Sequence, residues 1–153
     1  AEQFKEYHQT MLAMATELKA MHLMVNNLYD KQKQLEGLLS SLPDDAKFSA
    51  VKKDGEALLK KMKAWDEEMV QRKSKAYDDV ENFPNKFTAD YLFMMNQTES
   101  DIPRVGQPSL DLMKEMNGKW VGLKSRGTEM IEKDVPKMNK TLWEVGTGAI
   151  WKE

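Results

Sequence analysis

Apolar side chains recur at alternating intervals of four and three residues along the first forty positions of the chain. Nine of the ten positions reached by this spacing are apolar, and no Pro interrupts them. These positions are Tyr7, Met11, Met14, Leu18, Met21, Val25, Leu28, Gln32, Leu35 and Leu39. The spacing predicts one face of a helix about 50 Å long, at about 1.5 Å per residue. The segment "GLLSSLPDDAKF" then supplies the Gly, Ser and Pro residues that end helices and form turns.

The same spacing begins again at Phe48 and predicts a second amphipathic helix over residues 46–78. Its apolar face holds Phe48, Val51, Gly55, Leu58, Met62, Trp65, Met69, Arg72 and Ala76. Its charged face holds Lys52, Lys53, Lys60, Lys61, Lys63, Asp66 and Glu67. We expect this helix to bury the first set and to expose the second.

Two further helices are predicted in the second half of the chain. Pro84 favours a break, because the residue before a proline avoids the helical region. Helical spacing resumes at Phe83, Phe87, Tyr91, Met94 and Thr98. After the loop "ESDIPRVGQPS", a fourth helix is expected to begin near Pro108 or Ser109. Its stripe is Leu110, Met113, Met116, Trp120, Leu123, Gly127 and Met130.

Pro136 is expected to end or kink the fourth helix, and "KMNKTLWEVG" to add one or two helical turns. Four apolar stripes with short connections predict an all-α fold. We therefore expect an antiparallel bundle of about four helices with a short extra C-terminal helical segment. The length of 153 residues suits a single domain over 1–153.

The charge is balanced, with 23 Lys and Arg against 25 Asp and Glu, and it is spread evenly along the chain. No basic stripe is present, so a nucleic-acid partner is not expected. No apolar run approaches the roughly 18 residues that a membrane span needs. The absence of cysteine excludes disulfides, thiolate catalysis and cysteine zinc sites. Because the chain begins at Ala1, we expect a mature product or a fragment of a longer protein.

Candidate catalytic and metal-binding groups are few. His8 and His22 lie about 21 Å apart along one helix, too far to share a metal ion. Di-iron bundles place Glu three residues before His, where this chain has Lys5 and Lys19. The acidic clusters at 44–45, 66–68 and 78–79 are typical of solvated helix surface. We expect no catalytic residue, no metal and no cofactor, and therefore no enzymatic activity within this chain.

The twelve Met and four Trp residues each allow two interpretations. Methionine can form an adaptable groove for partner helices, but core filling is favoured because six Met lie on the stripes. Trp65 and Trp120 also lie on stripes and are expected to be buried. Trp143 and Trp151 lie near the C-terminus, where a partner domain could cover them.

The segment "WDEEMVQRKSKAYDDVENFPNKF" resembles the C-terminal helical region of large bacterial secreted proteins described as sortilin-like or BNR-repeat glycosyl hydrolases. The matching positions are Trp65, Glu67, Gln71, Lys73, Ser74, Asp79, Asn82, Phe83, Pro84 and Asn85. The likeness extends to residues 21–30 and 134–150. It implies a β-propeller body elsewhere in the same parent protein, and a secreted, periplasmic or cell-envelope location. The Ser-x-Asp-x-Gly-x-Thr repeats of propeller blades are absent from this chain, so any hydrolysis would belong to the propeller.

Two functions follow as expectations. The first is a non-catalytic accessory domain that packs on, caps or spaces the propeller. Its candidate interaction surface comprises Tyr77, Asn82, Phe83, Asn85, Trp143 and Trp151. The alternative is an extracytoplasmic ligand-sensing four-helix bundle, which requires a polar-lined pocket between helices and a small-molecule ligand of unknown class.

Overall fold

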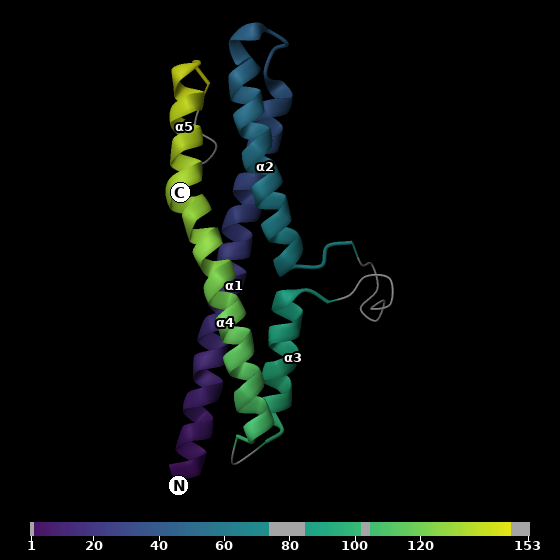
Figure 1. Cartoon of the computed structure of the whole chain (residues 1–153), viewed down its shortest axis with the longest axis vertical. Helices are drawn as coiled ribbons and strands as arrows, with labels where there is room; N and C mark the ends of the chain where they lie inside the picture. Colours follow the sequence, from purple (N-terminus) through teal and green to yellow (C-terminus); the bar gives the residue numbers. More distant parts are fainter. Residues whose placement is uncertain (1, 74–84, 102–104, 148–153) are drawn as a thin grey trace. The chain divides into compact units, whose positions relative to one another are not determined.

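The computed structural model describes residues 2–73, 85–101 and 105–147, and no strand occurs within these ranges. The elements are α1 (Glu2–Ser41), η1 (Ala46–Phe48), α2 (Ser49–Met69), α3 (Phe87–Glu99), α4 (Gln107–Glu129), the π-helical η2 (Met130–Asp134) and α5 (Val135–Glu144) (Figure 1). The predicted all-α helical bundle is confirmed. None of the described helices is both long enough and apolar enough to cross a membrane.

The chain divides into two compact units. Unit 1 consists of Ala1–Met24 and Glu67–Lys124, and unit 2 consists of Val25–Asp66 and Ser125–Glu153. Each unit combines three main helical segments, because α1 and α4 each contribute residues to both units. The expectation of one domain over residues 1–153 stays a prediction.

In unit 1, α3 runs antiparallel to the first part of α1. The hydroxyl of Tyr7, near the start of α1, donates to the carbonyl oxygen of Glu99, the last residue of α3, at 2.9 Å. The hydroxyl of Tyr91 on α3 donates to Oδ1 of Asn117 on α4 at 3.0 Å. The buried apolar side chains of this unit are Tyr7, Met14, Met21, Met69, Phe87, Tyr91, Met94, Met116 and Trp120. All of them lie on the predicted stripes, so the stripes supply most of the core.

In unit 2, the second part of α1 packs closely against α2. A Cβ built on Gly55 would lie 2.7 Å from both terminal methyl carbons of Leu39, so glycine allows the two helices to approach. The core consists mainly of aliphatic and sulfur-containing side chains. Its buried apolar residues are Val25, Leu28, Leu35, Val51, Leu58, Leu59, Met62, Trp65, Met130, Val135, Met138 and Leu142.

The predicted end of the second helix is wrong, because α2 ends at Met69 rather than at residue 78. In a continued helix the amide of Lys73 would donate to the carbonyl of Met69. Instead it donates to Oε1 of Gln71 at 2.9 Å, and the Met69 carbonyl accepts from Oγ1 of Thr88 at 2.9 Å. Beyond Met69 the stripe continues only through Arg72 and Ala76, which offer little apolar surface to bury.

The predicted exposure of Asp66 is also wrong. Asp66 is buried with a relative exposure of 7%, and Leu59, which was not placed on the stripe, is buried as well. A helix that packs against two neighbours needs a wider buried face than one row of positions at intervals of four and three residues. Asp66 lies one turn beyond Met62 and joins this wider face.

Pro136 does not end the helix. It falls in the first turn of α5, directly after the π-helical turn Met130–Asp134. The amide of Val135 donates to the carbonyl of Met130, five residues back, instead of four. The wider turn relieves the clash between a proline ring and the carbonyl four residues before it. The expected C-terminal helical segment is present as α5 and is ten residues long.

Candidate interaction surface

The structure describes two of the six predicted interaction residues. Asn85 is exposed just before α3 in unit 1, and Trp143 is 78% exposed on α5 in unit 2. The other four, Tyr77, Asn82, Phe83 and Trp151, lie outside the described residues, as does the predicted break at Pro84. Asn85 and Trp143 belong to different compact units, so the six-residue surface stays a prediction.

The histidines do not contribute to a metal site in the described part of the chain. His8 and His22 are both exposed on α1. Across residues 2–73, 85–101 and 105–147, no three His, Cys, Asp or Glu side chains come together in a way that could hold a metal ion.

Exposed apolar side chains are concentrated in unit 1. Of the eight large hydrophobic side chains exposed among the described residues, seven belong to this unit. They are Phe4, Leu12, Leu23, Leu92, Phe93, Leu110 and Val121, and Trp143 is the eighth. Leu110 lies on a predicted apolar stripe but is 41% exposed, which corrects the expectation that this position is in the core. The other seven exposed residues are apolar but lie on none of the predicted stripes, and this is the feature of the sequence that could have identified them.

Helix α3 carries apolar side chains on two faces. Phe87, Tyr91 and Met94 are buried, whereas Leu92 and Phe93 on the outer face are exposed by 43% and 61%. An ordinary surface helix places polar residues on the face that points away from the core. The outer face of α3 is therefore a candidate contact surface.

Two neighbouring hollows lie between α1 and α4 in unit 1, and we call them the first and second stretch of the α1–α4 groove. The first has a volume of about 440 Å³, and the second about 340 Å³. The first is lined by Gln3, Glu6, Thr10, Val105, Gly106, Gln107 and Leu110. The second is lined by Ala13, Met14, Glu17, Tyr91, Met113, Asn117, Trp120, Val121 and Lys124. Lining positions on the two helices rise together in residue number, so α1 and α4 are parallel here.

Polar contacts fix the floor of the second stretch. The indole Nε1 of Trp120 donates to Oε2 of Glu17 at 2.7 Å, which ties α4 to α1. Phe87 lies 6.1 Å from Tyr91 and 6.4 Å from Trp120 between ring centroids, in the range of favourable aromatic contacts. Burial, together with the negative charge of Glu17, raises the pKa of Tyr91 to about 12. Tyr91 therefore remains a neutral hydrogen-bond donor to Asn117 at neutral pH.

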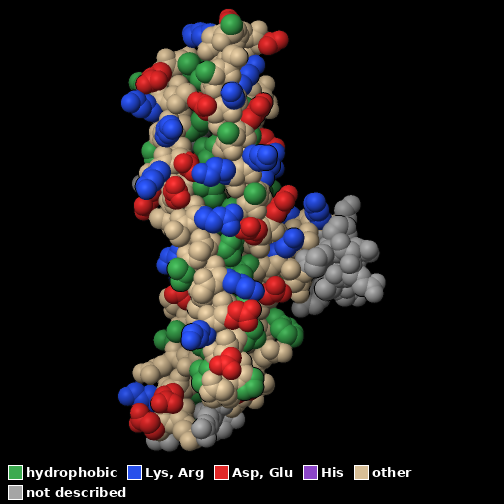
Figure 2. Space-filling model, viewed as in Figure 1, with side chains coloured by type: hydrophobic (Ala, Val, Ile, Leu, Met, Phe, Trp, Pro, Cys, Tyr) green, Lys and Arg blue, Asp and Glu red, His purple; other side chains and the backbone are tan. Residues whose placement is uncertain are grey.

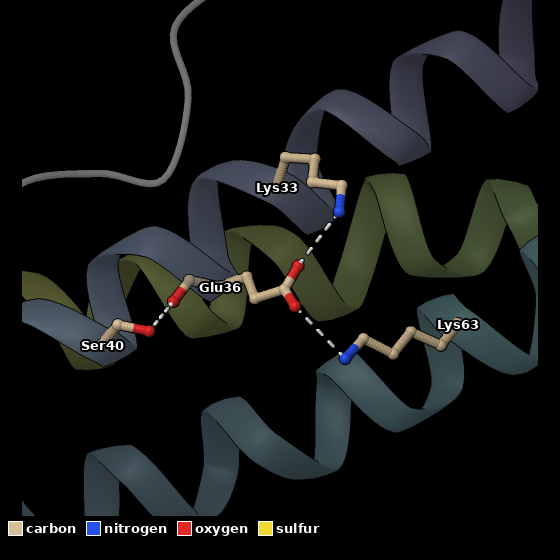
Figure 3. A network of polar contacts seen from close by, with 4 residues as sticks. All are labelled: Lys33, Glu36, Ser40 and Lys63. Atoms are coloured by element: carbon tan, nitrogen blue, oxygen red, sulfur yellow. Dashed lines mark hydrogen bonds and ion pairs between the residues drawn. The ribbon is translucent and has the colours of Figure 1, made fainter.

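Unit 2 presents a more polar surface. The carboxylate of Glu36 on α1 lies between two lysines, 3.6 Å from Nζ of Lys33 and 3.4 Å from Nζ of Lys63 on α2 (Figure 3). Lys61 on α2 pairs with Asp134 at 2.7 Å, beside a groove of about 230 Å³ between α2 and α5. Exposed pairs of this kind contribute little stability, typically below about 1 kcal/mol. They keep the helix surfaces solvated.

The charges form no field of a single sign on the face drawn in Figure 2, where Lys and Arg alternate with Asp and Glu. Unit 1 carries ten Lys and Arg against thirteen Asp and Glu, and unit 2 carries thirteen against twelve. Neither balance is typical of a nucleic-acid-binding surface.

No protein-family model matches the chain, and the comparisons with curated proteins and with solved structures give no match either.

Proposed function

We propose that this chain is a non-catalytic helical interaction domain that contacts its partner through the exposed apolar surface of unit 1. The observation that carries the proposal is the placement of seven of the eight exposed large hydrophobic side chains in that unit. The exposed part of an apolar side chain gains no burial free energy on folding, and an interface that covers it would gain that free energy.

The identity of the partner rests on the resemblance of residues 65–87, 21–30 and 134–150 alone. On that basis the partner is the β-propeller of the same parent protein, in a secreted, periplasmic or cell-envelope setting. The domain would pack on the propeller or cap it, while any glycoside hydrolysis would take place in the propeller. No nucleic-acid contact is part of this proposal.

Site-specific photocrosslinking tests the proposal. A photoreactive phenylalanine analogue is placed at Phe93 in unit 1 or, as the control, at Trp143 in unit 2, within the natural full-length protein in its own cells. Both side chains are aromatic and exposed, by 61% and 78%, so neither replacement should disturb the core. We expect a discrete crosslinked product from position 93, with mass spectrometry assigning the attached peptide to a β-propeller.

Two outcomes would count against different parts of the proposal. Equal or stronger crosslinking from position 143 would contradict the assignment of the interaction surface to unit 1. Crosslinking from position 93 to a protein region without propeller blades would retain the interaction domain and reject its propeller partner.

A ligand-sensing bundle is the second candidate. The second stretch of the α1–α4 groove favours it, because Glu17, Asn117 and Lys124 bring polar groups beside the apolar Met113 and Val121. A thermal-shift screen of the chain against amino acids, organic acids and sugars tests this candidate. A ligand at about one hundred times its Kd stabilises the native state by about 2.7 kcal/mol and raises the Tm measurably. No shift with any class would reject the sensor.

A further inference from the structure

We infer that the groove between α1 and α4 in unit 1 receives one amphipathic helix of a partner protein, with basic residues along the flank that faces α1. This inference rests on the proposed function and specifies how the partner binds.

The groove has the length and regularity of a helix-binding site. On α1 the lining runs from Gln3 through Thr10 to Glu17, and on α4 it runs from Gln107 to Lys124. Lining residues recur every three or four positions on both helices, so the two stretches occupy successive turns. Fourteen residues between Gln3 and Glu17 correspond to about 21 Å, or about four turns of a bound helix.

Among its described residues, unit 1 has no fourth long helical segment. Its three main segments are residues 2–24 of α1, α3, and residues 107–124 of α4. A helix laid between α1 and α4 would complete a four-helix arrangement, which is a common way to bury apolar helix faces. Helix-in-groove binding uses apolar anchors at the same three- and four-residue intervals.

The two edges of the groove differ in chemistry. The α4 edge offers the apolar side chains of Leu110, Met113 and Val121, with Lys124 at its far end, and Val121 is 67% exposed. The α1 edge offers the carboxylate of Glu6 and that of Glu17, whose Oε2 also accepts from Trp120, and it carries no Lys or Arg among its lining residues. A bound helix would therefore place an apolar stripe against α4 and Lys or Arg against α1.

A flat aromatic ligand fits this groove less well. Tyr91 and Trp120 line the floor but are 0% and 2% exposed, so their ring faces are already covered by protein. The rest of the lining is a mixture of aliphatic and polar side chains, which suits the side chains of a helix better than a flat ring.

The test measures binding of two synthetic peptides to the full chain by fluorescence anisotropy. Both peptides are helical, about eighteen residues long, with leucines at intervals of three and four residues. One carries lysines along one flank of the leucine stripe, and the other carries glutamates at the same positions. We expect the lysine peptide to bind roughly tenfold more tightly than the glutamate peptide, with a difference that shrinks as salt is added.

Matched variants locate the binding site. The double variant Leu110→Ser and Val121→Ser should weaken binding of the lysine peptide by roughly tenfold. The control is Trp143→Ser, which removes an apolar side chain of unit 2 that is 78% exposed and does not line the groove. The control should leave the affinity unchanged, and unchanged Tm values would show that both variants fold.

The variant Glu6→Lys should reduce the preference for the lysine peptide, since Glu6 is exposed on the α1 edge. Equal affinity of the two peptides, or equal loss in the double variant and in the Trp143→Ser control, would overturn the inference. So would a dimer of the chain that the Leu110 and Val121 variant dissociates, because the occupant would then be a second copy.

The outcome is separable from that of the proposed function. Strong crosslinking from position 93, with no peptide binding, would reject the groove and keep the interaction domain. Peptide binding without crosslinking from position 93 would reject the outer face of α3 and leave the groove as the contact.

Discussion

Unit 1 and unit 2 are built from the same kind of helical segments, but their cores and surfaces differ. Unit 2 buries mainly aliphatic side chains and methionine, and its surface carries the ion pairs of Glu36 and Asp134. Unit 1 buries an aromatic cluster whose polar atoms donate to side chains on neighbouring helices. It also leaves seven large apolar side chains in water.

The comparison distinguishes apolar residues that are buried in a core from apolar residues that remain exposed on the surface. In unit 2, Trp143 is the exposed large apolar side chain among the described residues, and the others are buried or half-buried. In unit 1, seven large apolar side chains lie exposed outside the buried core. A partner that covers them would stabilise the complex, because burial in an interface has the same physical origin as burial in a core.

The largest expected effect lies in the core of unit 2. Leu35→Ala should lower the free energy of unfolding by about 2–5 kcal/mol, because Leu35 is fully buried and its removal leaves a cavity. Urea denaturation followed by circular dichroism measures the change. A loss below about 1 kcal/mol would mean that the side chains around Leu35 collapse into the space and leave little cavity.

The polar core of unit 1 is tested by Trp120→Phe. This change removes the hydrogen bond to the Glu17 carboxylate and should cost about 1.5–3 kcal/mol in unfolding free energy. Trp143→Phe is the matched control and should change stability by less than about 0.5 kcal/mol, because Trp143 is mostly exposed. An equal loss of unfolding free energy in the two variants would mean that the hydrogen bond between Trp120 and Glu17 does not stabilise unit 1.

The polar side chain of Gln32 is buried in the largely apolar core of unit 2. Gln32 is 6% exposed, and its Oε1 has no hydrogen-bond partner among the described residues. Gln32→Leu should therefore stabilise the chain by about 1 kcal/mol, because an unsatisfied buried acceptor is replaced by an apolar group. Thermal denaturation measures the change, and Gln34→Leu at an exposed position serves as control. A destabilised Gln32→Leu variant would show that the amide oxygen has a partner.

The smallest effects come from glycine. Gly122 on α4 in unit 1 is exposed with open space around it, so Gly122→Ala should stabilise the helix by about 0.5–1 kcal/mol. Gly55→Ala in unit 2 should gain less or destabilise, because the new Cβ would displace the Leu39 side chain. Chemical denaturation of both variants makes the comparison, and equal gains would mean that α1 and α2 pack loosely at Gly55.

Much of the fold could be predicted from the spacing of apolar residues. Seven of the ten stripe positions on α1 are buried, and Met11, Leu18 and Leu39 are half-buried. Trp65 and Trp120 are buried as expected. The end of α2 could not be predicted from the stripe. It involves Thr88, which is distant in sequence, is not a stripe position, and donates its hydroxyl to the carbonyl oxygen of Met69. The π-helical turn before Pro136 was not predicted, because a proline within a helical pattern is normally interpreted as the end of the helix or a kink.

The candidate surface was harder to predict than the fold. The groove exists only where α1 and α4 lie side by side, and the sequence does not state which helices become neighbours. Leu92 and Phe93 lie on a helix whose buried face was already assigned to other residues. The spacing of apolar residues therefore gave no reason to predict a contact surface at these two positions. The cluster around Asn82 and Phe83 lies outside the described residues and remains a prediction.

Hydrogen exchange tests the central claim most directly. Amide exchange is measured for the chain alone and for the chain within the natural complex recovered by crosslinking at position 93. We predict slower exchange in α3 and in the unit 1 parts of α1 and α4, with little change in α2 and α5. Slower exchange confined to α2 and α5 would contradict the assignment of the interaction surface to unit 1.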